Sequence, residues 1–119
     1  METINLENKF RLIADYWNPR ILGELNDSYI KAVKVKGEFV WHHHDNEDEL
    51  FLVTKGALRM KFRDHESVIR EGEFIIVPRG VEHCPVADEE VHLILMEPKS
   101  TLNTGNITNE RTVAQLERI

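Results

Sequence analysis

The sequence predicts an all-β protein, built as a sandwich or a barrel. Through the middle of the chain, many short apolar runs follow one another at regular spacing, with polar or glycine-containing turns between them. One run alternates Leu58, Met60 and Phe62 with charged residues, as a half-buried strand does. Two others, 50–53 and 74–77, are apolar throughout, as expected for strands that are buried on both faces.

A short helix is expected over residues 4–17, before the strands begin. Its apolar side chains follow helical spacing, at Leu6, Phe10, Ile13, Ala14 and Trp17. Thr3 or Asn5 is the expected N-cap, and Asn18-Pro19 is expected to end the helix, because the residue before a proline disfavours helical dihedral angles. A helix of this length is predicted to cover one face of the sheet or to contact a second subunit.

A hairpin is predicted next, from a strand at 21–25 through the turn Asn26-Asp27 to a strand at 29–35. Three of its charged side chains are expected to face water or to protect a strand edge, namely Lys31, Lys34 and Lys36. The hairpin therefore opens the sheet, and the remaining strands follow it in the chain.

The second half of the sheet is expected to begin at a tight corner, Pro78-Arg79-Gly80, because proline fixes φ and glycine permits positive φ. Two more strands are predicted at 82–86 and 91–96, separated by a turn at Asp88–Glu90.

Residues 98–119 are polar and without period, which predicts either a tail that wraps the surface or a disordered segment. Thr112 and Gln115 match a capping box and predict a short final helix. No repeat and no second core interrupts the chain. We therefore expect one domain over 1–119, with its barrel core at about 28–97.

The length, net charge and cysteine content of the chain limit the classes of function. A chain of 119 residues with a formal net charge of −6 is not expected to bind nucleic acid or an anionic membrane, since both attract basic surfaces. Cys84 is the single cysteine, which favours a reducing compartment. The first residues lack the apolar core of a signal peptide, and no apolar run reaches the length of a membrane helix. The expected location is the cytoplasm.

The chemistry is expected in a stretch of three consecutive histidines followed by an acidic run. Side chains two apart on a strand share a face, so His42 and His44 are predicted to leave one strand side by side, while His43 points away. Residues 45–48 are predicted to form a turn. Glu49 then opens a second strand that pairs back beside the first, so two imidazoles and a carboxylate converge.

A downstream histidine, His83, can complete this set. Three imidazoles and a carboxylate suit Zn, Fe, Mn, Ni or Cu, and the mixture selects none of them. Glu47 and Asp48 compete with Glu49 as the carboxylate, because strand parity is lost across a turn. His92, on the last strand, has two interpretations, as a pocket group or as a structural histidine.

These residues resemble the two sequence motifs of the cupin superfamily. At the family's spacing, the first motif is matched by Gly37, His42, His44, Glu49 and Gly56. The second is matched by Gly72, Pro78, Gly80 and His83. The distance to Gly56 favours Glu49 over its acidic neighbours. The second motif usually ends in an asparagine four residues after its histidine, and this chain departs from it with Ala87.

The resemblance implies a jelly-roll barrel, the double-stranded β-helix of cupins, with one divalent transition-metal ion inside it. The implied ion is Zn, Fe, Mn or Ni, and its implied ligands are His42, His44, Glu49 and His83. Cupins are commonly homodimers. The tail at 101–106, after the two motifs, also looks like that of short bacterial monocupins. These are often labelled mannose-6-phosphate-isomerase-like, a label that rests on the shared barrel more than on chemistry.

The expected interior is apolar, and the substrate pocket is expected to include Val40, Phe51, Met60 and His92. An apolar pocket beside a metal suits a small, partly hydrophobic carbonyl or phenolic compound. Arg59 and Lys61 are expected to face outward, so no phosphate clamp is assigned.

Two functions remain open. One is a metalloenzyme of isomerase or dioxygenase type that acts on a small oxygenated substrate. The other is a non-catalytic module that binds a small molecule or a metal.

Overall fold

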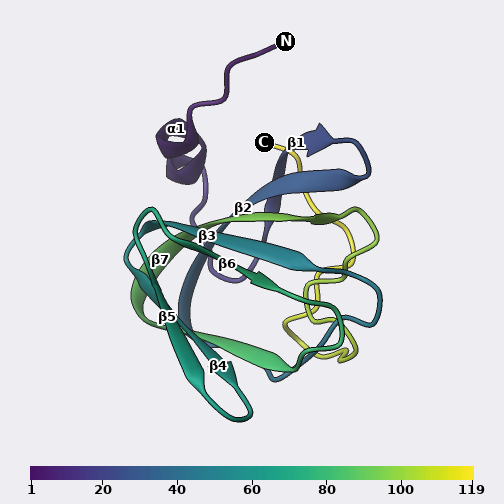
Figure 1. Ribbon diagram of the computed structural model, residues 1–119. Coiled ribbons are helices and arrows are strands. Elements are labelled where there is room, and N and C mark those ends of the chain that lie inside the picture. The colour runs from purple at the N-terminus through teal and green to yellow at the C-terminus, as the bar shows by residue number, and fades with distance from the viewer.

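The computed structural model describes residues 1–119 and shows one short helix followed by seven strands (Figure 1). In chain order these elements are α1 (Leu6–Arg11), β1 (Arg20–Leu25), β2 (Ser28–Glu38), β3 (Glu49–Lys55), β4 (Ala57–Phe62), β5 (Glu66–Arg70), β6 (Phe74–Val77) and β7 (His83–Pro98). Every strand pair is antiparallel. The prediction of an all-β protein with a short N-terminal helix is therefore confirmed.

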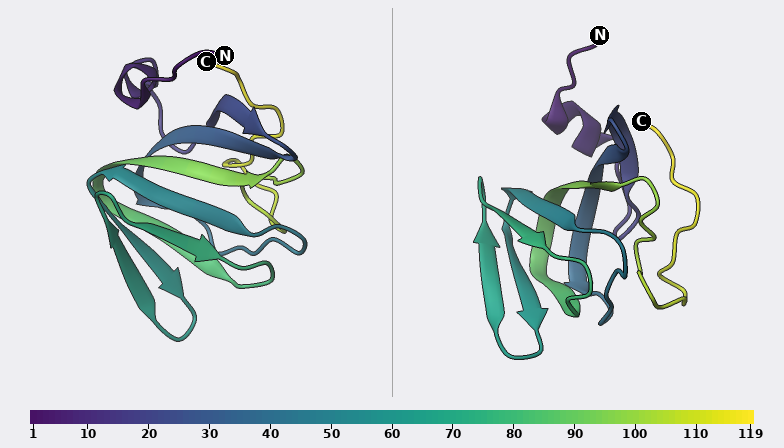
Figure 2. Two further views of the ribbon diagram at one scale, coloured as in Figure 1. Left: turned by 45° about the horizontal axis from the view of Figure 1, so that its top comes forward. Right: turned by 45° about the vertical axis from the view of Figure 1, so that its right-hand side comes forward.

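Strand β7 organises the sheet. The strand order is β1-β2-β7-β3-β6, and the first part of β7 also pairs with β4, which carries β5. The β4–β5 hairpin lies at the end of the molecule opposite α1 (Figure 2). Residues 83–86 of β7 pair with β4, and residues 92–96 lie between β2 and β3. One long strand thereby joins the two parts of the barrel wall.

The turn predicted at Asp88–Glu90 is wrong, because β7 runs through these residues without interruption. Val35 pairs with Val91, and Gly37 pairs with Ala87, so residues 88–90 face a single residue of β2. The charged residues therefore sit on a bulge of a continuous strand. Such a bulge bends the strand without ending it, and Gly37 at φ 88° accommodates the irregularity on the β2 side.

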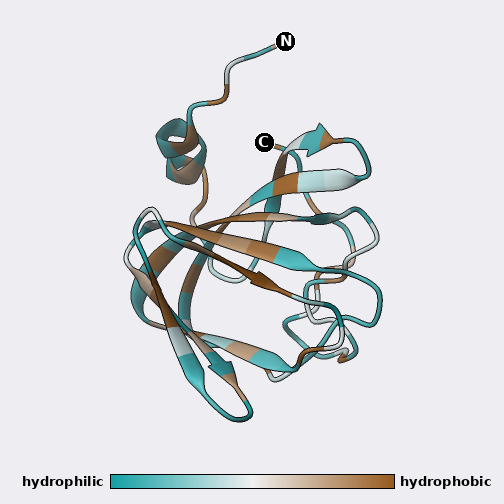
Figure 3. Ribbon diagram, in the orientation of Figure 1, coloured by the Kyte–Doolittle hydropathy of each residue, from teal (hydrophilic) through white to brown (hydrophobic).

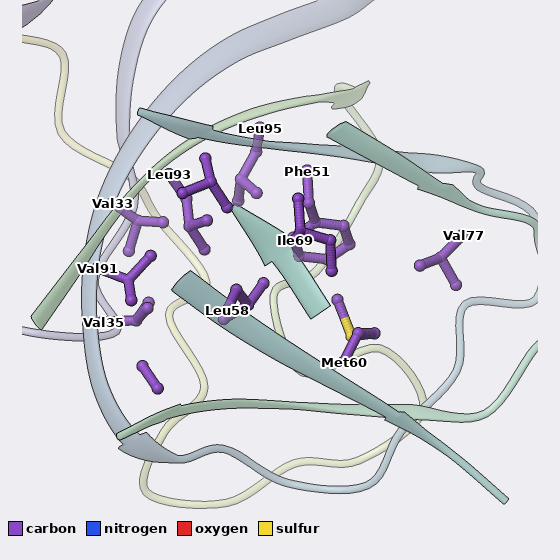
Figure 4. Close-up of a cluster of buried hydrophobic side chains, with 12 residues drawn as sticks. Val33, Val35, Phe51, Leu58, Met60, Ile69, Val77, Val91, Leu93 and Leu95 are labelled. Atoms are coloured by element: carbon purple, nitrogen blue, oxygen red, sulfur yellow. The ribbon is translucent and has the colours of Figure 1, made fainter. Parts of the chain in front are cut away.

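The interior of the barrel is filled by alternate side chains of the strands. Figure 4 shows these side chains pointing toward one another between the strands. They include Val33, Val35, Phe51, Val53, Leu58, Met60, Ile69, Val77, Val91, Leu93 and Leu95. The most hydrophobic stretches lie on β3, β6 and β7, while the turns are hydrophilic (Figure 3). This core holds the strand ends, from which the polar site described below is built.

The helix is shorter than the predicted 4–17. Asn5 caps it by accepting a hydrogen bond from the Asn8 N–H at 2.9 Å, and the helix ends at Arg11. Trp17 has a left-handed φ of 60°, and its N–H donates to the carbonyl of Lys34. The chain thus leaves helical geometry, and Trp17 packs against the barrel core instead of continuing the helix face.

The helix covers the outer face of the sheet. Phe10 and Ile13 are buried there against Leu22, Ala32 and Ile94. This arrangement agrees with the predicted role of covering one sheet face. The six residues of α1 form the only helix, which is far too short to cross a bilayer.

The last residues wrap the barrel as an ordered tail without a helix or strand of its own. Figure 2 shows the tail running beside β1. The final helix predicted at Thr112–Gln115 is wrong: the Thr112 hydroxyl accepts from the Asn109 N–H and closes a turn. At its end the tail pairs with β1, where the Ile21 N–H donates to Glu117 and the Ile119 N–H donates to Ile21.

Candidate metal centre

The first two histidines of the site lie in the irregular segment between β2 and β3, so the prediction that they share a regular strand is wrong. The segment does not pair with β3. Instead, the N–H and carbonyl groups of His42 exchange hydrogen bonds of 3.1 and 2.9 Å with those of His83. The backbone is still extended enough to alternate, because His42 and His44 are buried while the side chain of His43 is 27% exposed.

The other two residues open strands. Glu49 is the first residue of β3 and points inward, like Phe51 and Val53 further along that strand. His83 is the first residue of β7 and is fully buried. The structure thereby brings together the four residues named from the sequence. Their ligand atoms all lie within 4.8 Å of one another.

Backbone carbonyls set the orientation of two of the rings. The Nδ1 atom of His42 lies 2.9 Å from the carbonyl oxygen of Val40. The Nδ1 atom of His83 lies 2.9 Å from the carbonyl oxygen of Val81. An Nδ1–H that donates to a carbonyl leaves Nε2 free to accept a metal ion, and such outer bonds fix the ring of a metal ligand.

The buried polar atoms at the centre lack hydrogen-bond partners. His44 Nε2 lies 2.7 Å from Glu49 Oε1, and His83 Nε2 lies 3.3 Å from the same oxygen. None of these three atoms makes a hydrogen bond of acceptable geometry, although all are buried. Unsatisfied buried polar groups are costly. A divalent cation among them would satisfy all three, so the residues present fit the ion that the sequence motifs imply.

The electrostatics of two ligands favour the protonation states that a metal ion requires. Burial, reinforced by the neighbouring His83, lowers the pKa of His42 to about 4, so its imidazole is neutral at pH 7. Burial opposes ionisation of Glu49, but its interactions with Glu97, His44 and His83 hold the pKa of this carboxyl well below its usual range. Metal binding needs a neutral imidazole and an ionised carboxylate.

Lys31 lies inside the barrel, which corrects the prediction that it faces water. Its Nζ donates to Glu97 Oε1 at 2.6 Å, and both side chains are 2% exposed. Lys31 shares the inward face of β2 with Val33 and Val35, so the strand geometry overrides the usual preference of lysine for solvent. Burial, together with the nearby Glu49, raises the pKa of Glu97 well above its ordinary value.

A small, mostly apolar cavity adjoins the four residues. It measures about 40 Å³, which is room for about three water molecules. Its polar lining consists of His42, Glu49, Glu97 and Asn103. Its apolar lining consists of Trp17, Pro19, Val33, Val35, Phe39, Phe51, Pro85, Leu93 and Leu95. Trp17 and Phe39 stack on each other, with ring centroids 4.7 Å apart.

Of the four residues expected in a substrate pocket, Phe51 lines this cavity and the other three do not. The carbonyl oxygen of Val40 contacts His42 Nδ1, and Met60 is buried in the barrel core. His92 is on the outer face, because its neighbours Val91 and Leu93 point inward. Its ring stacks on Phe10 at 4.5 Å.

The sequence reasoning missed several residues around the cavity. Glu97 follows Leu93 and Leu95 at alternate positions of β7, so parity could have placed it inside. Trp17 and Asn103 come from segments outside the strands, and no periodic signal pointed to them. Arg59 and Lys61 face outward as expected, in ion pairs with Asp88 and Glu38.

The sequence is similar to that of a known protein family and of a curated protein. The family model described as "Cupin domain" matches residues 30–97. The "Uncharacterized protein YdbB" of Bacillus subtilis (strain 168) is 36% identical over 63 residues, which are 52% of this chain. The match spans only 56% of that protein's length.

Two solved structures are similar over most of the chain. A cupin-2 domain-containing protein from Shewanella frigidimarina NCIMB 400 has a TM-score of 0.81 and 45% identity, covering 82% of this chain and 95% of that one. Protein NMB1881 from Neisseria meningitidis has a TM-score of 0.76 and 33% identity, covering 82% of this chain and 100% of that one.

Proposed function

Because the chain belongs to the cupin family and buries three imidazoles and a carboxylate around one point, we propose that it is a small metalloenzyme acting on a small oxygenated substrate. The proposed chemistry is of isomerase or dioxygenase type. The observation that carries the proposal is the set of buried, unpartnered atoms on His44, Glu49 and His83, which lies directly beside a cavity. A ligand set next to a cavity is what a substrate-binding metal centre requires.

The proposed cofactor is one divalent transition-metal ion, Zn, Fe, Mn or Ni, held by His42, His44, Glu49 and His83. Four protein ligands leave up to two positions open on a six-coordinate ion. Bound there, the ion would supply Lewis-acid chemistry to a substrate oxygen, and iron would add oxygen chemistry. The chain itself supplies three buried imidazoles, a buried carboxylate and a mostly apolar cavity lining.

The cavity lining supports a small and partly apolar substrate, such as a carbonyl or phenolic compound. Aromatic and aliphatic side chains form most of the lining, and no lysine or arginine is among the lining residues. Arg59 and Lys61 are engaged in ion pairs on the outer surface. A sugar phosphate would need a free cationic clamp, and the one lysine inside the barrel, Lys31, is already bonded to Glu97. The lining therefore gives no support to a mannose-6-phosphate-isomerase-like activity.

A screen of reconstituted protein tests the proposal. The protein would be loaded separately with Fe²⁺, Zn²⁺, Mn²⁺ or Ni²⁺ and incubated with small carbonyl and phenolic compounds. An oxygen electrode and NMR would follow oxygen uptake and products. We expect turnover in at least one metal form, lost in Glu49→Ala and retained in the exposed-site control His65→Ala.

The alternative is a non-catalytic binding module, favoured by the lack of any acid or base at the cavity beyond Glu97 and the ligands themselves. It predicts saturable binding with no product in any metal form.

We also propose a homodimer, since a row of apolar side chains is left open on the outer face of the sheet edge. On β6, Phe74 is 60% and Ile76 53% exposed. They pair with Leu52 and Leu50 of β3 and so extend the apolar face of that strand. Phe74→Glu is expected to give a monomer by light scattering. The control is Val68→Glu on β5, which also removes one exposed apolar side chain and is expected to leave the dimer intact. A monomeric wild-type protein would contradict the proposal.

We also propose a cytoplasmic location. Cys84, a free and buried thiol, supports it because free thiols are typical of reducing compartments. Cell fractionation with an antibody to the protein tests it, and recovery outside the cytoplasmic fraction would contradict it.

A further inference from the structure

The backbone of the ligand-bearing segment 42–44 is held at three points. His42 exchanges two hydrogen bonds with His83, as described above. The carbonyl of His44 accepts a bond of 2.7 Å from the N–H of Gly80. Both of these partners lie within residues 30–97, which the cupin model covers. The third anchor, at His43, comes from the C-terminal tail, which lies beyond that match.

Asn106 supplies the third anchor with two hydrogen bonds to one residue. The N–H of His43 donates to Asn106 Oδ1 at 2.9 Å. The N–H of Asn106 donates to the carbonyl of His43 at 3.0 Å. The asparagine thus satisfies both backbone groups of the residue between the two histidine ligands, much as a neighbouring strand would. Since this segment has no strand partner on that side, the tail takes the place of one.

The adjacent tail residues contact the ligands closely. Gly105 packs so tightly that a Cβ atom would lie 2.2 Å from the carbonyl oxygen of His43 and 3.2 Å from Cδ2 of His42. The Ser100 hydroxyl donates to Glu47 Oε2 at 2.8 Å. The other oxygen of Glu47 lies 4.0 Å from His44 Nδ1, on the side of the ring away from Glu49. The close packing of Gly105 therefore limits the movement of His42.

We propose that Asn106 is a positioning residue of the metal centre: it fixes segment 42–44 so that His42 and His44 stay aimed at the ion. This inference rests on the proposed metal site. It assigns a function to the C-terminal tail, which the sequence predicts either to wrap the surface or to be disordered. Residues that support metal ligands from outside the first layer typically change metal affinity by about 10–100-fold when they are replaced.

Metal affinity measured with Co²⁺ alone tests the inference. Titration of metal-free protein, followed by visible absorption, reports both the dissociation constant and the ligand geometry. We expect Asn106→Ala to weaken Co²⁺ binding by about tenfold and to change the spectrum. Asn106→Asp keeps the acceptor oxygen and is expected to restore affinity to within about threefold of wild type, a rescue that depends on the bond to the His43 N–H.

Asn109→Ala is the matched control. Asn109 Oδ1 accepts from the Arg111 N–H at 2.9 Å, so this variant loses a tail hydrogen bond without touching segment 42–44. It is expected to leave Co²⁺ affinity and spectrum unchanged, even where both alanine variants lose similar melting temperature. Equal affinities and spectra for wild type and Asn106→Ala would overturn the inference, and so would an equal loss in Asn109→Ala. Absence of Co²⁺ binding by wild type would instead refute the proposed metal site itself.

Discussion

Acid is expected to destabilise the metal-free protein through His42, and the size of the effect follows from its environment. Burial holds the pKa of His42 at about 4 in the folded chain, against 6.5 for an unperturbed imidazole. The unfolded chain therefore binds the extra proton between these values. The resulting loss of folding stability is absent above about pH 6.5 and complete below about pH 4. Linkage gives a loss of about 2 kcal/mol between pH 7.5 and pH 5, and about 3 kcal/mol over the whole range.

Urea unfolding of chelator-treated protein at several pH values measures this slope. Other groups also titrate in the range, so the informative quantity is the difference between wild type and His42→Gln, which lacks the titrating ring. The variant is expected to lose about 2 kcal/mol less than wild type on going from pH 7.5 to pH 5. His65→Gln, which removes an exposed histidine, is the control variant. Equal slopes for wild type and His42→Gln would refute the reasoning.

Three further predictions concern the metal, the buried contact between Lys31 and Glu97, and the core. Removing the metal with a chelator is expected to lower the melting temperature of wild type but not of His44→Ala. A bound ion at 100 times its dissociation constant adds about 2.7 kcal/mol to the free energy of unfolding. Equal shifts for the two proteins in calorimetry would contradict this. Lys31→Met leaves the Glu97 carboxyl buried without its hydrogen-bond donor and is expected to cost about 1–3 kcal/mol in urea unfolding, most of it recovered in Lys31→Met/Glu97→Leu. A cost below about 0.5 kcal/mol would contradict a buried hydrogen bond. Leu58→Ala, at a fully buried core position, is expected to cost about 2–5 kcal/mol by the same assay, and a smaller loss would place this side chain outside the core.

The four site residues were accessible from the sequence because they fall at the spacing of the two cupin motifs. His42 and His44 remain on the inner side although their segment is irregular, since an extended backbone still alternates its side chains. Glu49 and His83 each open a strand, directly after a turn rich in charged residues or glycine. The exact pairing was not accessible, because the segment bonds to the start of β7 and not to β3.

The misplaced residues fall into two kinds. For Lys31 and His92 the signal existed: both alternate with neighbours whose burial is clear, and side-chain type was given more weight than strand parity. For Trp17 and Asn106 no local signal existed. Trp17 fits helical spacing until its positive φ turns the chain. The partner of Asn106 lies 63 residues away in sequence, and a polar tail without a period does not show where it docks.

The central claim is that the four buried residues hold one divalent ion, and metal content tests it most directly. The protein would be purified without added metal, and bound metals would be measured by inductively coupled plasma mass spectrometry, beside a His42→Ala/His44→Ala variant. We predict close to one transition-metal ion per wild-type chain and essentially none in the variant. Wild type that holds no metal even after reconstitution, or a variant that holds as much as wild type, would contradict the account.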